Sequence, residues 1–71
     1  MRLERLAKDS TSGDGGCPSV HLDHDTGNLV FQGQQVPNSA LPSYLPGEVG
    51  LELTPDIVVR AMEAYRAKGL L

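Results

Sequence analysis

The sequence predicts an α+β fold in which one C-terminal helix packs on a three-stranded antiparallel sheet. Two alternating apolar and polar segments, residues 19–23 and 29–36, flank a turn and have the period of half-buried strands. A third alternating segment covers residues 49–53. Apolar residues then recur at helical spacing between Ile57 and Tyr65. Three strands followed by one helix give the predicted fold class.

The length of 71 residues allows one domain. A chain this short buries only about 60% of its unfolded surface, so it needs a metal, a partner or a very regular core. Its single cysteine excludes a disulfide within the chain. We divide the chain into an N-terminal segment, residues 1–16, and one small α+β domain, residues 17–71.

The N-terminal segment predicts a short helix followed by a connector. Leu3, Leu6 and Ala7 have helical spacing, but a helix of one or two turns is marginal unless it docks on another element. Residues 10–16 are serine, threonine, glycine and aspartate, which favour loops. We therefore expect residues 1–16 to be flexible or marginally helical.

A hairpin is the clearest element of the domain. Residues 24–28 supply turn formers, and Gly27 is the expected holder of a positive φ angle. Gly33 within the second strand predicts a bulge or a close approach of another backbone. In the first strand, the alternation places Val20 and Leu22 in the core.

Prolines punctuate residues 37–46 and exclude long regular structure there. The apolar side chains of this loop, Leu41, Tyr44 and Leu45, are placed to clamp it onto the core. The third strand, residues 49–53, follows this loop and is expected to join the hairpin sheet.

The segment Thr54-Pro55-Asp56 predicts the start of the C-terminal helix. Threonine can accept bonds from free amides, proline tolerates the first helical position, and aspartate complements the macrodipole. The apolar face of this helix is expected to comprise Ile57, Val58, Ala61, Met62 and Tyr65. Gly69 is the expected stop signal.

Ligand-type residues crowd the first strand of the hairpin. Cys17, His21 and His24 have the spacing Cys-x3-His-x2-His, and cysteine with histidine is the donor set of zinc sites. On an extended strand, however, these three side chains converge only if the chain bends. We expect His21 and Asp23 on the exposed face, and we keep a small zinc-binding protein as the alternative function.

Catalysis is not predicted. Cys17 and His21 are four residues apart, which on a strand is roughly 13 Å, too far for a nucleophile and its base. A chain of this length also has little material for a closed pocket. We therefore predict neither an enzyme nor a cofactor.

Charge limits the classes of partner. The net charge is −3, and residues 9–59 contain no lysine or arginine, whereas nucleic-acid binding depends on basic patches. The longest apolar runs are far shorter than the roughly 20 residues of a membrane span. With one free cysteine and no secretory pattern near the start, we expect a soluble cytoplasmic protein.

The remaining class is a protein-interaction module. Open sheet edges allow strand addition, and the free face of the helix allows helix packing. The small core makes a homo-oligomer an additional source of burial. The predicted partner-binding residues lie on and after the helix: Val59, Arg60, Glu63, Arg66 and Leu70.

Two segments of the chain resemble a known family. Residues 8–17 form a serine-rich and glycine-rich run that ends in cysteine, and residues 51–55 read Leu-Glu-Leu-Thr-Pro before the helix. This order of signals resembles the BldB-like family of small actinobacterial proteins. The resemblance implies a cytoplasmic accessory protein, commonly encoded beside a helix-turn-helix regulator, that acts through protein contacts in gene regulation or development.

Overall fold

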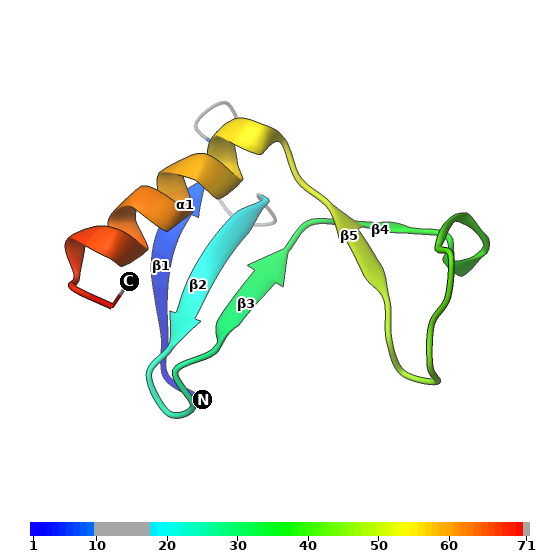
Figure 1. Ribbon diagram of the computed structural model, residues 1–71, viewed down its shortest axis with the longest axis horizontal. Helices are drawn as coiled ribbons and strands as arrows, with labels where there is room; N and C mark the ends of the chain where they lie inside the picture. Colours follow the sequence, from blue (N-terminus) through cyan, green and yellow to red (C-terminus); the bar gives the residue numbers. More distant parts are fainter. Residues whose placement is uncertain (10–17, 71) are drawn as a thin grey trace.

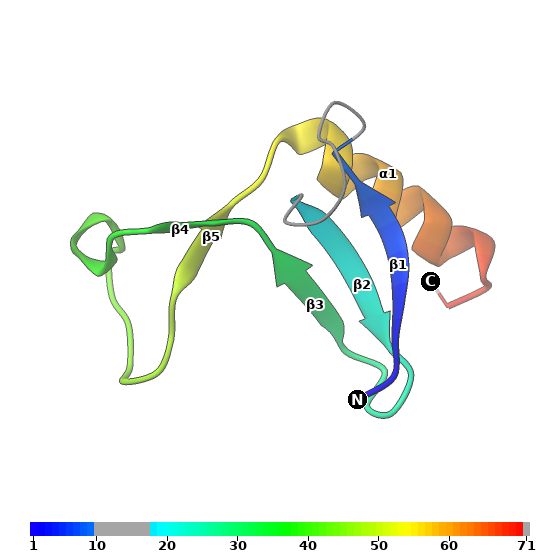
Figure 2. The same ribbon diagram turned by 180° about the vertical axis from the view of Figure 1, so that it is seen from behind.

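The computed structural model describes residues 1–9 and 18–70, and it confirms an α+β fold (Figure 1). Three antiparallel strands form one sheet in the order β1-β2-β3, and a helix, α1, covers one face of it (Figures 1 and 2). A second sheet of two strands, β4 and β5, extends away from the first. The elements are β1 (Leu3–Lys8), β2 (Ser19–Asp23), β3 (Leu29–Gln32), β4 (Gln34–Val36), a 3-10 helix η1 (Asn38–Ala40), β5 (Gly50–Glu52) and α1 (Pro55–Ala67).

The predicted N-terminal helix is wrong, because residues 3–8 are a strand that pairs with β2. The register of this pair shifts between Arg5 and Ala7, so that β1 carries a bulge. Leu6 and Ala7 consequently both pack against the core. Two adjacent inward residues break the alternation of a strand and produce the helix-like spacing. Residues 3–8 therefore belong to the domain rather than to a separate N-terminal segment.

The predicted connector at residues 10–16, and Cys17, lie outside the described residues.

The core lies between α1 and the first two strands. Val20 and Ile57 are 0% and 1% exposed, and Ala61 of α1 is fully buried beside them. Burial of a valine or isoleucine side chain contributes roughly 1.5–3 kcal/mol. Leu22 is also buried, so the predicted burial of both apolar residues of β2 is confirmed. Of the predicted helix face, Ile57, Ala61 and Met62 pack in the core, whereas Val58 and Tyr65 are half-buried.

Backbone chemistry sets the ends of α1 much as predicted. Pro55 occupies the first helical position, and Gly69 has a φ of +79° after the last turn. Thr54 differs from the expectation: its hydroxyl donates to Asp56 Oδ1 at 2.7 Å and does not accept from a helix amide. The carboxylate of Asp56 is thereby held beside the positive end of the helix.

The prediction that residues 49–53 form the third strand of the hairpin sheet is wrong. β5 pairs with β4 in the second sheet, and β1 takes the third place beside β2. At Gly33 the chain leaves the first sheet, where β3 pairs with β2, and enters the second sheet, where β4 pairs with β5. A Cβ at this position would lie 2.8 Å from Leu53 Cδ1 and 2.9 Å from the carbonyl oxygen of Glu52, so the predicted close approach is confirmed.

Residues 34–52 form an arm that projects from the sheet and helix (Figures 1 and 2). Leu41 packs onto Gly50 within the arm, but Tyr44 and Leu45 are 52% and 67% exposed. The expected clamp of these two residues on the core is therefore absent. The radius of gyration is 13.1 Å, compared with about 11 Å for a compact chain of this length. The arm accounts for this extended shape.

Substitution of Gly33 by alanine tests the contact that turns the chain into the arm. We expect Gly33→Ala to destabilise the fold by about 1–3 kcal/mol, because the new methyl group meets a backbone oxygen as well as a side chain. Urea unfolding followed by circular dichroism measures this. Ser39→Ala on the exposed surface of η1 is the control, with an effect within about 0.5 kcal/mol. Equal unfolding curves for the two variants would contradict the role of Gly33.

Candidate functional site

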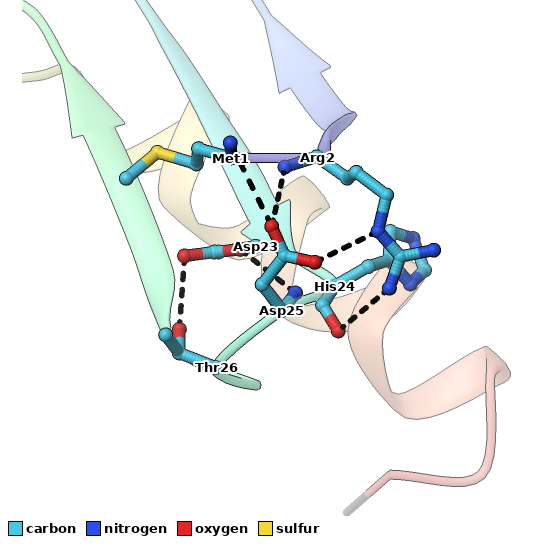
Figure 3. Close-up of polar contacts among 6 residues, drawn as sticks. All are labelled: Met1, Arg2, Asp23, His24, Asp25 and Thr26. Atoms are coloured by element: carbon cyan, nitrogen blue, oxygen red, sulfur yellow. Dashed lines mark hydrogen bonds and ion pairs between the residues drawn. The ribbon is translucent and has the colours of Figure 1, made fainter.

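The turn between β2 and β3 is organised by Asp23 (Figure 3). Its carboxylate accepts bonds from the Asp25 amide and the Thr26 hydroxyl, both at 2.9 Å. The Gly27 amide donates to the Asp23 carbonyl at 2.8 Å, and Gly27 has the predicted positive φ, +80°. Asp23 is 3% exposed, so the prediction that it faces solvent is wrong. Its side chain instead folds back over the amides of its own turn.

These bonds also explain the acidity of Asp23. The Asp25 amide, followed by the Thr26 hydroxyl, stabilises the charged carboxylate and lowers the pKa of Asp23 below its usual value. Asp23 is therefore a charged turn cap at neutral pH, with both of its oxygens already bonded.

The next acidic residue of the turn, Asp25, holds the start of β1 (Figure 3). Its carboxylate accepts from Arg2 Nε at 2.8 Å and from the Arg2 amide at 3.1 Å, and the Met1 amine lies 3.7 Å away. The Arg2 guanidinium also donates to the His24 carbonyl at 3.4 Å. Exposed ion pairs contribute at most about 1 kcal/mol each. Their main effect here is to fix the ends of β1 and β2 together.

The two histidines of the cluster have separate partners. His21 Nε2 lies 2.9 Å from Ser19 Oγ, whereas His24 Nε2 lies 2.8 Å from Glu4 Oε1. Glu4 pairs with Leu22 and shares its helix-covered face, and His21 points to the opposite face. The imidazoles therefore do not converge.

No group of three or more histidine, cysteine, aspartate or glutamate residues able to hold a metal occurs within residues 1–9 and 18–70. Cys17, the third residue of the predicted zinc set, is outside these ranges. Zinc binding that involves Cys17 stays a prediction.

Glu4 connects the sheet to the end of α1. Besides His24, its carboxylate bonds Lys68 Nζ at 2.6 Å. The bond from Lys68, followed by that from His24, lowers the pKa of Glu4. The last turn of the helix is thus held on β1 by a charged contact.

A groove of about 540 Å³ opens beside this contact. Three of its polar side chains already have partners within the chain, since Lys68 and His24 bond Glu4 and Asp23 caps its turn. Engaged groups of this kind position elements of the fold and are poor candidates for acid–base chemistry. The groove is lined by Leu22, Asp23, His24, Gly27, Tyr65, Lys68 and Leu70.

The predicted partner-binding residues of the helix divide into three groups. Val59, Glu63 and Arg66 are exposed and lie at helical spacing on one face of α1. Leu70 is exposed but lines the groove at the end of the helix. Arg60 donates to the Lys8 carbonyl at 2.8 Å and to Asp56 at 3.3 Å, and so ties the helix to β1.

A second surface was not among the predicted sites. Residues 26–47 contain no aspartate, glutamate, lysine, arginine or histidine, and they form β3, β4, η1 and the tip of the arm. The absence of charge from residues 26–47 can be read from the sequence, but the position of these residues on β3 and the projecting arm cannot. We call the exposed apolar residues in and beside this stretch the neutral surface: Phe31, Tyr44, Leu45, Val49 and Leu51.

Comparisons of the chain with family models, curated proteins and solved structures find no match. The BldB-like resemblance therefore stays a prediction. None of the helices in the described part of the chain combines the length and the apolar character needed to cross a membrane.

Acid unfolding tests the role of Asp23. A carboxyl group with a lowered pKa in the folded state contributes stability above its unfolded pKa of about 4, and this contribution disappears as the pH falls through the folded value. We therefore expect the free energy of unfolding to decrease from about pH 5 downward. Asp23→Asn should show a shallower decrease, measured by urea unfolding at several pH values. Glu63→Gln, on the exposed helix face, should keep the native slope. An unchanged slope in Asp23→Asn would exclude the turn cap as the cause.

Metal analysis tests the zinc alternative. Because the two histidines lie on opposite faces of the sheet, we expect well under one zinc per chain in folded protein purified without chelator. Inductively coupled plasma mass spectrometry gives the ratio. One zinc per chain that is lost in both His21→Ala and His24→Ala would contradict this expectation and restore the predicted cluster.

Proposed function

We propose that this chain is a non-enzymatic protein-interaction module that acts in the cytoplasm as a small accessory regulator of transcription or development. The observation that carries the interaction part is the portion of the neutral surface that lies on the arm: Tyr44, Leu45, Val49 and Leu51. The regulatory part follows from the resemblance to the BldB-like family.

The arm has little stability of its own in the isolated chain. A two-stranded ribbon is marginally stable in water, and this ribbon pairs only three residues on each strand. Tyr44 and Leu45 stand exposed at its tip. A partner that covers these side chains would stabilise the arm by removing apolar surface from water.

The exposure of apolar side chains supports the same proposal. Tyr44, Leu45 and Val49 of the arm are 52%, 67% and 54% exposed, so the arm carries apolar surface that a bound partner would remove from water.

The charge pattern favours a protein partner over nucleic acid. The net charge is −3, and no lysine or arginine lies between Asp9 and Val59, the range that includes the whole arm. Phosphate binding depends on such cations. A neutral apolar surface instead suits a polypeptide that contributes backbone bonds and apolar contacts.

Capture from the native host tests this function. We expect wild-type chain to retain a specific protein and Tyr44→Ser/Leu45→Ser to lose it, with binding of the purified pair weakened at least about tenfold by calorimetry. Val59→Ser is the matched control, because Val59 is 55% exposed but lies on α1. Loss of capture in the control and not in the arm variant would move the interaction to the helix, and capture of nothing by wild type would contradict the proposal.

A further inference from the structure

We propose that the partner of β3 is β3 of a second copy, so that two chains form one six-stranded sheet across a two-fold axis at Val30. This inference names a partner for the proposed interaction module and rests on that function. It follows from three properties of β3: an unprotected edge, the direction of its free backbone groups, and a side-chain pattern that complements itself.

The two edges of the three-stranded sheet differ in protection. Natural edges are protected from pairing by charges, prolines and bulges. β1 has such protection, since it carries Glu4, Arg5 and Lys8 and the bulge between Arg5 and Ala7. β3 reads Leu-Val-Phe-Gln, and its outer edge has no strand beside it in the part of the chain that the structure describes. Pairing with another strand is therefore disfavoured at β1 and open at β3.

Hydrogen bonds at the turn fix the direction of the β3 backbone. The Asp23 amide donates to the Asn28 carbonyl at 2.9 Å, so Asp23 and then His21 direct their peptide groups toward β3. In an antiparallel pair, bonded and non-bonded positions alternate. Val30, opposite His21, therefore bonds inward, whereas Leu29 and Phe31 direct their amide and carbonyl groups outward.

These outward groups match those of a second β3. In a symmetric antiparallel pair, Leu29 of each copy faces Phe31 of the other, and each facing pair exchanges two backbone bonds. Val30 faces Val30 of the second copy at the axis, where the side chains approach closely. Leu29 is half-buried and Phe31 is 39% exposed, so both retain apolar surface for this contact. One register thus satisfies the bonds and pairs apolar side chains.

Charge does not oppose a second copy as the occupant of this edge. Each chain has a net charge of −3, so two copies repel one another wherever acidic surfaces meet. Residues 26–47 are uncharged and include all of β3 and the following part of the arm. Two copies can meet along this segment with no like charges facing each other.

Mass measurement and amide exchange test this pairing on the wild-type chain. Light scattering after size exclusion should give twice the chain mass of 7.6 kDa at near-millimolar concentration. In the dimer, the Leu29 and Phe31 amides should exchange at least about tenfold more slowly than in dilute monomer. The Val30 and Gln32 amides, which bond β2, should be protected at both concentrations.

A charge placed on the axis gives a second test. Val30→Lys sets two ammonium groups opposite each other and should yield a monomer with a native circular dichroism spectrum. Val59→Lys makes the same change on the exposed helix face and should remain dimeric. If Val30→Lys fails to fold, the exchange pattern of the wild-type chain decides alone.

A monomeric mass at near-millimolar concentration, or a dimer in which the Leu29 and Phe31 amides stay unprotected, would overturn this inference. Either result leaves the proposed function intact if a different host protein is still captured through Tyr44 and Leu45. A β3 dimer that captures no other protein would support the inference and contradict the regulatory function.

Discussion

The whole structure depends on the packing of α1 against β1 and β2. Val20 in the central strand and Ile57 in the first turn of the helix are the largest fully buried side chains, and the alanines Ala7 and Ala61 let the two layers approach closely. A core this small leaves little reserve of apolar burial. The chain compensates by attaching the ends of its elements to each other, so that fraying at one end is opposed by a contact from another element.

These attachments give the charged residues a common role. Arg60 reaches the carbonyl at the end of β1, Lys68 reaches Glu4 on the same strand, and Asp25 holds Arg2 beside the turn. Each contact joins residues more than twenty positions apart in the sequence. The charged side chains of these contacts lie on the first sheet, its turn and the helix, whereas the arm carries only Glu48 and Glu52, both in its second half. Charged contacts therefore hold the sheet and helix together, and residues 26–47 carry no charge.

Local patterns predicted most elements but not their pairing. The alternation in residues 19–23, the glycine at position 27 and the helix from Pro55 onward follow from short-range chemistry, and the structure agrees with them.

β1 was missed because one bulge makes an apolar pair look helical. The pairing of β5 was missed because a short alternating segment does not specify its neighbour. Asp23 was predicted to be exposed because alternation describes strands, whereas its side chain bonds the turn and is buried. The lack of charge in residues 26–47 could be read from the sequence, but only the fold shows that these residues lie on β3 and the arm.

The change of pairing partner at Gly33 has a consequence for how this protein tolerates change. Because the chain leaves one sheet and enters the other at a single glycine, the tip of the arm shares no core side chain with α1. Sequence at the tip is thus decoupled from the stability of the scaffold. Residues 37–49 can therefore change in sequence or length while the sheet and helix keep their packing.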